Sequence, residues 1–127
     1  MITKYIFLFA GFSGFIGVAL GAFGAHGLRG KLDESGMHAY ETAVSYQLIH
    51  TLALLVCLML MTQLGKYWAF TYASFAFSIG ILLFSGSLYV LTVFGLKIFG
   101  PITPLGGIFL LAGWVLLSLG IWQKYEL

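Results

Sequence analysis

Near its start the sequence carries a long uncharged run, YIFLFAGFSGFIGVALGAFGAHGL, from Tyr5 to Leu28. Lys4 precedes this run and Arg29 follows it. A helix needs about 20 mostly apolar residues to cross the hydrocarbon core of a bilayer. The run is therefore long enough for one membrane crossing.

A cleaved signal peptide is the main alternative for this run, because a lysine precedes it and small residues recur between Ala22 and Ala25. The apolar part of a signal peptide usually covers about 7 to 15 residues. This run continues without a charge from Tyr5 to Leu28. We therefore interpret it as a retained transmembrane helix.

Three further apolar runs of similar length follow, at 42–64, 67–94 and 104–122. The charged residues fall between or outside the four runs, as expected from the cost of a charge at the bilayer centre. The longest polar segment, 29–41, is expected to lie at the interface. We predict an all-α integral membrane four-helix bundle, a single domain over 1–127, with both termini on the same side.

The composition supports a membrane protein and excludes other classes. Of 127 residues, 61% are hydrophobic and 8% are charged, whereas about a quarter are charged in an ordinary soluble domain. The aromatic and aliphatic content also excludes a disordered chain. A net charge of +2 is too small and too scattered to attract nucleic acid, so the lipid bilayer is the expected partner and nucleic acid is not.

The distribution of positive charge does not orient the chain. In bacterial membrane proteins Lys and Arg gather on the cytoplasmic side. Here the predicted topology places three of them at each face: Lys4, Lys66 and Lys124 at one, and Arg29, Lys31 and Lys97 at the other. The sequence therefore predicts the number of crossings but not their direction.

The ends of the helices have recognisable signals. Gly30 is expected to end the first helix, and Asp33 to cap the second. Thr103 followed by Pro104 is a good combination of N-cap residue and first helical residue. We therefore expect the fourth helix to begin there.

Small residues recur at helical spacing on the first run. Within lipid, such residues let helix backbones approach closely. We predict a helix-packing face from Gly14, Gly17, Gly21 and Gly24. The alternative is a flexible or broken helix over Gly21–Gly27 that lines a cavity.

Hydroxyl residues share one face of the third run, including Ser74, Ser78 and Ser85. They could bond to neighbouring helices or to carbonyls of their own helix. A water-lined path usually adds an intramembrane charge, and no predicted span contains one. We assign Ser74 and Ser78 to helix packing.

The most polar cluster of the second run contains Tyr46, Gln47 and His50, at helical spacing. An unpaired imidazole at this depth would be costly. One interpretation is structural, with His50 bonded to Ser85 or to a free carbonyl near Gly24. The other is a ligand site formed by His26, Tyr46, Gln47, His50 and Ser85.

No metal site or cofactor is predicted. Cys57 is the only cysteine, so no internal disulfide can form. Cys57 and His50 are seven residues apart, about 10 Å along a helix, which is too far for them to bind one ion without another span. A haem held between His26 and His50 would need the end of the first helix to bend inward.

Five short motifs occur in order: GAFGAHGL at 21–28, TAVSYQLIH at 42–50, FSGSLY at 84–89, ITPLGG at 102–107 and GW at 113–114. Together they resemble the YgdD/YwdK-like family of small bacterial inner-membrane proteins, a domain of unknown function. The likeness covers nearly the whole chain. It implies a four-helix, multi-pass protein of the bacterial cytoplasmic (inner) membrane, and it supplies no established activity or catalytic residues.

Three functional hypotheses follow from the sequence. The leading one is a structural, assembly or accessory component that packs with itself, as a homo-oligomer, or with a larger membrane complex. The second is a binding site for a lipid, quinone or haem, or a transport pathway, centred on His50, Gln47 and His26. The third, an enzyme acting at the headgroup surface through Asp33, His38 and Glu41, has the least support, because no catalytic arrangement is recognisable.

Overall fold

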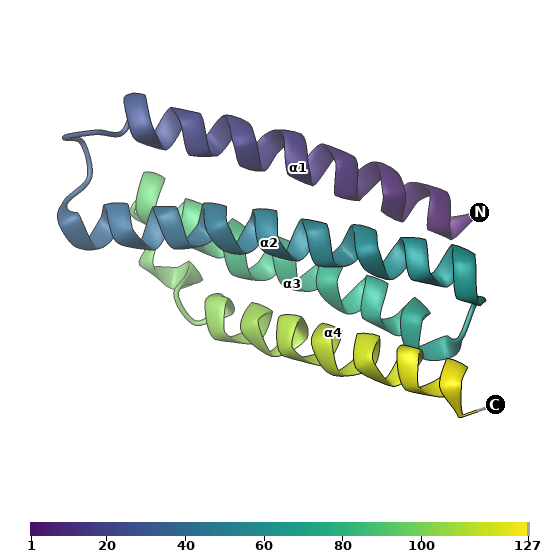
Figure 1. The fold of residues 1–127 in the computed structure, drawn as a ribbon. Helices are drawn as coiled ribbons and strands as arrows, with labels where there is room; N and C mark the ends of the chain where they lie inside the picture. Colours follow the sequence, from purple (N-terminus) through teal and green to yellow (C-terminus); the bar gives the residue numbers. More distant parts are fainter. Residues whose placement is uncertain (127) are drawn as a thin grey trace.

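The computed structural model describes residues 1–126 and confirms the predicted all-α architecture. Its elements are α1 (Ile2–His26), α2 (Glu34–Leu64), α3 (Trp68–Val93), a short 3-10 helix η1 (Lys97–Phe99) and α4 (Ile102–Tyr125). No strand occurs between residues 1 and 126. The four long helices alternate in direction, so the N- and C-termini lie at the same end of the bundle (Figure 1).

All four helices have the length and composition that a membrane crossing requires. Large apolar side chains cover their outer surfaces; Phe15, Leu52, Leu82 and Leu111 are all more than half exposed. In water such a surface would drive aggregation. In a bilayer this apolar surface faces acyl chains, so the outer surface of the bundle suits a membrane environment.

Two predictions about helix ends need correction. α1 ends at His26, before Gly30, because the N–H groups of Gly27 and Leu28 both bond to the Phe23 carbonyl. Gly30, with a φ of 80°, instead turns the chain in the loop, a conformation that glycine adopts without strain.

The start of α4 also differs from the prediction. The helix begins at Ile102, with Pro101 in the N-cap position. Thr103 does not cap it, because its hydroxyl bonds to Ser87 Oγ on α3 at 2.5 Å. At the start of α2 the prediction is confirmed: Asp33 Oδ1 accepts a hydrogen bond from the Gly36 N–H at 2.7 Å.

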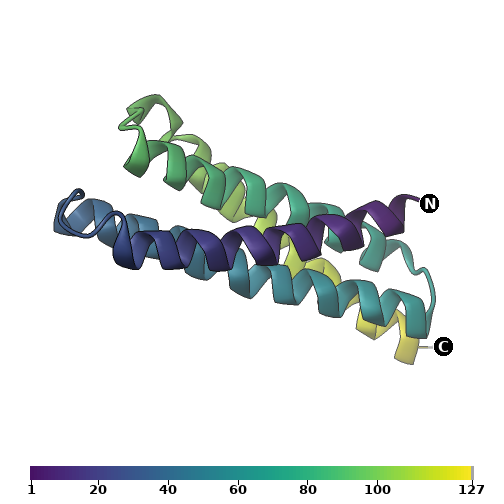
Figure 2. The same cartoon turned by 90° about the horizontal axis from the view of Figure 1, so that it is seen from above.

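Each helix packs mainly on its neighbour in the sequence. α1 lies along α2, α2 along α3 and α3 along α4, whereas α1 scarcely contacts α3 and α4 scarcely contacts α2. Figure 2 shows that the α1–α2 and α3–α4 hairpins diverge toward the end that carries their connections. Direct contact is therefore sparse between α1 and α3 and between α2 and α4.

Glycines on α4 hold that helix closely against phenylalanines on α3. A Cβ atom on Gly113 would lie 2.6 Å from ring atoms of Phe77, and one on Gly120 would lie 2.5 Å from ring atoms of Phe70. Both phenylalanines are fully buried. Since helices in lipid associate through close packing, these contacts fix the distance between α3 and α4.

A third glycine of α4, Gly106, packs on α3 seven residues before Gly113. A Cβ atom on Gly106 would overlap with the backbone nitrogen of Phe84, so here helix backbone packs against helix backbone. At one position the roles of the two helices are exchanged, because α3 supplies the glycine, Gly80, and α4 supplies the large side chain, Leu110. Leu110 Cδ2 would lie 2.5 Å from a Cβ atom added to Gly80. The α3–α4 contact is thus interdigitated from both sides.

The glycines of α1 contact α2. The nearest atoms to an added Cβ come from α2 at all four predicted packing positions, Gly14, Gly17, Gly21 and Gly24. The contact is closest at Gly17, where Leu48 Cδ2 would lie 2.6 Å away, and at Gly24, where the Tyr40 ring would overlap. α1 is not broken over this segment, because it continues to His26. Gly21, Gly24 and Ala25 do line a pocket against α2, as the alternative expected.

The hydroxyls of α3 divide between two roles. Ser74 Oγ donates to the Thr71 carbonyl and Ser78 Oγ to the Ser74 carbonyl, each at 2.7 Å, so both bond within α3. Ser85 Oγ instead crosses to α2 and donates to the Ala43 carbonyl at 2.7 Å. Ser85 therefore links the two central helices.

Gln47 joins three helices through hydrogen bonds. Its Nε2 donates to the Ser13 carbonyl of α1 at 2.9 Å, and its Oε1 accepts from the Tyr89 hydroxyl of α3 at 2.6 Å. Ser13 Oγ also bonds to Thr51 Oγ1 of α2 at 2.8 Å. Because Ser13, Gln47 and Thr51 are buried, this network positions α1 on the α2–α3 pair.

Substitution of Gly106 and Gly107 by alanine should have different effects on stability. Gly106→Ala should lower the free energy of unfolding by about 1 to 3 kcal/mol, because the new methyl group overlaps with the backbone of α3. Gly107→Ala should be neutral or stabilising, because a Cβ there lies 3.8 and 3.9 Å from the Phe84 ring. Denaturant titration in mixed micelles measures both, and equal effects would show that the α3–α4 distance is wrong.

The Gln47–Tyr89 bond can be tested by a double-mutant cycle. With Gln47→Leu and Tyr89→Phe, we expect a coupling energy of about 0.6 to 1.7 kcal/mol, the range measured for hydrogen bonds between membrane helices. Tyr72→Phe is the control, since Tyr72 lies exposed on the same helix. Additive effects of the two substitutions on the unfolding free energy would argue against the bond.

Candidate functional site

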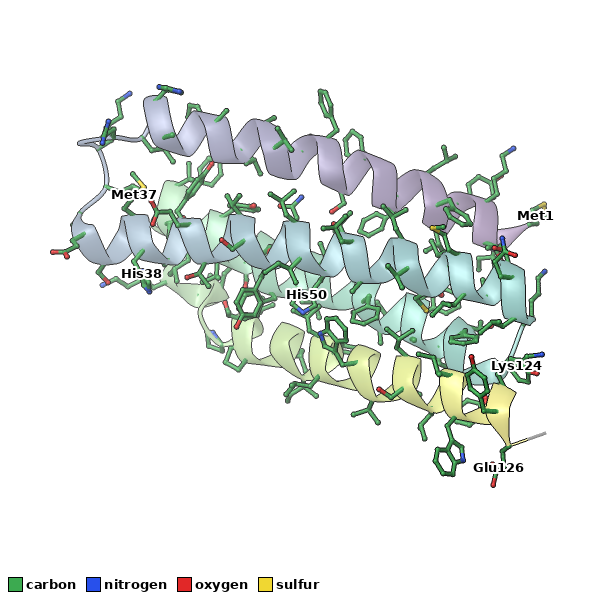
Figure 3. The ribbon with its side chains drawn as sticks, in the orientation of Figure 1. Met1, Met37, His38, His50, Lys124 and Glu126 are labelled. Atoms are coloured by element: carbon green, nitrogen blue, oxygen red, sulfur yellow. The ribbon has the colours of Figure 1, made fainter. Side chains whose placement is uncertain are left out.

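His50 is the polar residue of α2 that the helix packing leaves incompletely bonded. Its side chain is 7% exposed and points from α2 toward α4 (Figure 3). Nδ1 lies 2.7 Å from the Tyr46 carbonyl oxygen. Because a carbonyl can only accept, Nδ1 carries the proton, and Nε2 of the neutral ring is an acceptor. Nε2 makes no hydrogen bond within residues 1–126, and it is not fully enclosed, because the buried unpaired side-chain polar atom of the described residues is Gln123 Oε1.

Aromatic side chains surround the imidazole. The ring of Tyr46 stacks on His50, with centroids 5.4 Å apart, and on Phe84 of α3, with centroids 4.4 Å apart. From α4, Trp114 meets His50 edge-on at 6.0 Å. Trp114 also packs edge to face with the buried Phe77 at 5.5 Å. These contacts fix the plane of the imidazole and the direction of Nε2.

A cavity of about 600 Å³ adjoins this aromatic group. We call it the His50 cavity, and its lining comes from α2 (Tyr46, Ile49, His50), α3 (Phe84) and α4 (Pro104, Gly107, Ile108, Leu110, Leu111, Trp114). This lining contains no Asp, Glu, Lys or Arg. The volume lies within the usual range for small-molecule sites, about 300 to 1,000 Å³.

The position of α4 explains why the cavity exists. The glycines of α4 face α3, so that helix is held close to α3 and scarcely contacts α2. In the wall of the cavity Gly107, which lies beside the Phe84 ring, supplies no side chain to fill the space. The rim residues Ile49, Ile108 and Leu111 are more than half exposed, so the cavity opens sideways, toward the acyl chains.

The structure does not bring the five predicted site residues to one place. Tyr46 and His50 lie together at the His50 cavity. Gln47 and Ser85 instead line a smaller cavity of about 200 Å³ between α1 and α3. His26 is exposed at the end of α1 and lines neither cavity. The separation arises because Gln47 and His50, three residues apart on α2, face different helices.

The structural interpretation of His50 also requires a correction. Its bond is not to Ser85 or to a carbonyl of α1, but to the Tyr46 carbonyl one turn earlier on its own helix. Ser85 is already bonded to Ala43. The histidine therefore does not connect helices, and its second nitrogen is free to meet a ligand.

Several site residues were missed from the sequence. Trp114 lies in the middle of α4, whereas most transmembrane tryptophans lie near the interfaces, so its depth was a usable signal. Phe84 and Gly107 gave no such signal, because either could equally have faced lipid. Their roles depend on how α3 and α4 meet.

The other candidate groups have local roles. Cys57 is buried and donates to the Phe70 carbonyl at 3.4 Å. Asp33 caps α2, while His38 and Glu41 are exposed on its first turns. Within residues 1–126, no three His, Cys, Asp or Glu side chains are grouped as metal ligands would be.

Comparison with known proteins gives the same picture of a membrane protein without an assigned activity. The family model described as "Protein of unknown function (DUF423)" matches residues 20–107. That range contains Tyr46, His50, Phe84 and Gly107. No solved structure matches the chain.

Curated relatives match over most of their length. The "UPF0382 inner membrane protein YgdD" of Escherichia coli (strain K12) is 42% identical over 120 residues, covering 94% of this chain and 91% of the relative. The "UPF0382 membrane protein" of Haemophilus influenzae is 40% identical over 127 residues and covers both chains completely. The "UPF0382 membrane protein YwdK" of Bacillus subtilis is 39% identical over 98 residues, 77% of this chain and 80% of the relative. With four membrane-spanning helices and these relatives, the chain is a multi-pass protein of the bacterial inner membrane and belongs to the DUF423 family of unknown function.

Proposed function

We propose that this protein binds a small, lipid-soluble molecule in the His50 cavity, with His50 as the polar contact. The observation that carries the proposal is the free Nε2 of a nearly buried histidine beside an apolar cavity. An acceptor held away from water without a partner costs about 1 to 3 kcal/mol. Acyl chains cannot recover that free energy, whereas a ligand with a hydrogen-bond donor can.

The local chemistry of the cavity supports binding rather than catalysis. Its lining offers the His50 imidazole, the Tyr46 hydroxyl and the Trp114 indole N–H among stacked aromatic rings and aliphatic walls. No Ser, Thr, Cys, Lys, Asp or Glu lies in this lining, so the common pairs of nucleophile and base cannot be formed there. A binding function needs only shape, apolar contact and one oriented acceptor.

The role expected from the small-residue faces changes once the helices are placed. The sequence suggested an assembly or accessory component because glycine and serine faces were available for partners. In the folded chain the α1 glycines contact α2, and Ser74 and Ser78 bond within α3. These faces therefore give less support to assembly than the sequence alone suggested.

Self-association remains a second candidate, favoured by the open groove between α1 and α3. Gly86 of α3 lines this groove, and an added Cβ there would meet no atom within 4 Å, so a helix of a second copy could approach closely. Native mass spectrometry of the solubilised protein tests this. We expect a dimer that Gly86→Leu dissociates while Gly107→Leu leaves it intact, and a monomer at all concentrations would contradict it.

The binding proposal predicts that purified protein carries a lipid-soluble molecule that depends on the cavity. Gly107→Leu should remove this molecule, because the new side chain extends from the cavity wall into its volume without backbone overlap. Gly11→Leu is the matched control, since it adds the same side chain at a position with no atom nearby. Mass spectrometry of organic extracts gives the readout. Equal amounts of every extracted molecule in the two variants would contradict the proposal.

His50→Phe separates binding from folding. The phenyl ring keeps the stacking on Tyr46 and removes the unpaired nitrogen, so the unfolding free energy should be unchanged or higher. The amount of bound molecule should nevertheless fall at least about tenfold, the ratio that corresponds to a lost hydrogen bond of about 1.4 kcal/mol. His26→Phe is the control at an exposed histidine. Loss of stability without loss of the molecule would assign His50 a structural role.

A further inference from the structure

We infer that the ligand of the His50 cavity is a hydroquinone, the reduced, hydroxyl-bearing form of a membrane-dissolved quinone. The inference rests on the proposed binding function and specifies the chemical class of the ligand. Four properties of the cavity lead to it: the fixed hydrogen-bond role of His50, the absence of charge, the aromatic walls and the opening toward lipid.

The hydrogen-bond role of His50 requires a donor on the ligand. Nδ1 donates to the Tyr46 carbonyl at 2.7 Å, and this bond leaves Nε2 of the neutral ring with a lone pair and no proton. A hydroxyl group can donate to that lone pair. A quinone, which carries only carbonyl oxygens, cannot donate to Nε2; the donors that it could use in this lining are the Tyr46 hydroxyl and the Trp114 indole N–H. The acyl chain of a phospholipid makes no hydrogen bond at all.

The absence of charge restricts the ligand further. No cationic or anionic side chain occurs in the lining of the cavity. A fatty acid carboxylate, a phosphate headgroup or the propionates of haem would lose their hydration there without gaining an ionic partner, which is strongly unfavourable. The lining therefore selects a neutral molecule.

The aromatic walls favour a flat ring on that molecule. Tyr46 and Phe84 form a stacked pair at 4.4 Å, and Trp114 stands across the imidazole at 6.0 Å. Aromatic rings gain from offset stacking and edge-to-face contact beyond the area they bury. A hydroxylated ring beside His50 can make both contacts while it donates its hydrogen bond.

The opening of the cavity fits the long apolar tail of such a molecule. Ile49, Ile108 and Leu111 form an exposed aliphatic rim. A ring held at His50 can leave its isoprenoid tail between these side chains and the surrounding acyl chains. The ligand therefore enters from the bilayer, where quinones and hydroquinones dissolve.

The test compares three probes that differ only at the ring oxygens: a para-hydroquinone carrying one isoprenoid unit, the corresponding quinone, and the bis-methyl ether of the hydroquinone. Binding to the protein in lipid nanodiscs is measured by titration calorimetry under argon, with empty nanodiscs correcting for partition. The ether has the same ring and tail as the hydroquinone but no O–H donor, so it isolates the hydrogen bond.

We expect the unaltered protein to bind the hydroquinone about tenfold more tightly than the quinone or the ether, which corresponds to one additional hydrogen bond. In His50→Phe the three probes should bind with equal affinity, because the acceptor is gone while the apolar contacts remain. In His26→Phe the preference should persist. Gly107→Leu should weaken all three, which shows that they occupy this cavity.

Other outcomes separate this inference from the proposed function. Equal binding of hydroquinone and ether to the unaltered protein would overturn the inference, as would tighter binding of the quinone. If none of the probes binds but a molecule lost in Gly107→Leu co-purifies, the hydroquinone class is wrong and the binding function stands. If no probe binds and no molecule co-purifies, both fail.

Discussion

The close contact between the glycines of α4 and the phenylalanines of α3 determines the shape of this protein. Helices surrounded by lipid gain little from burying one apolar side chain against another, so close backbone approach and interhelical hydrogen bonds decide how they meet. The rings of Phe77 and Phe70 pack against Gly113 and Gly120, so the face of α4 that carries these glycines lies against α3. α4 therefore turns its larger side chains, including Trp114, toward lipid and the side of α2. The His50 cavity is a consequence of that arrangement.

The sequence was sufficient to predict the four helices, because the requirement to pair every backbone N–H and carbonyl within the bilayer leaves a helix as the default for each long apolar run. The Asp33 cap was predictable for a similar reason, since its side-chain acceptor serves N–H groups only three residues away. The cap predicted at Thr103 was wrong because its hydroxyl bonds to Ser87 on another helix. Local rules hold where no tertiary contact competes with them.

Contacts between helices were predictable only in part. The glycines of α1 were recognisable because they recur within four residues, whereas Gly106, Gly113 and Gly120 recur at intervals of seven, matched by Phe70, Phe77 and Phe84. The matching spacing becomes meaningful only when α3 and α4 are known to run side by side in opposite directions. The same limit applies to the site. Tyr46 and His50 were found from one helix, but Phe84 and Gly107 needed the positions of two more.

Gln47 and His50, the two polar side chains near the centre of α2, have different roles: one stabilises the fold and the other is proposed to bind a ligand. Gln47 uses both its amide nitrogen and its oxygen to hold α1 and α3, so it is satisfied and contributes to the fold. His50 bonds only to its own helix and leaves one nitrogen beside an uncharged cavity. An apolar ring at position 50 would pack as well and remove an unsatisfied acceptor, so folding alone gives no reason for histidine there. A histidine that the fold does not need, placed where the bilayer can deliver a molecule, is what the proposed binding function requires.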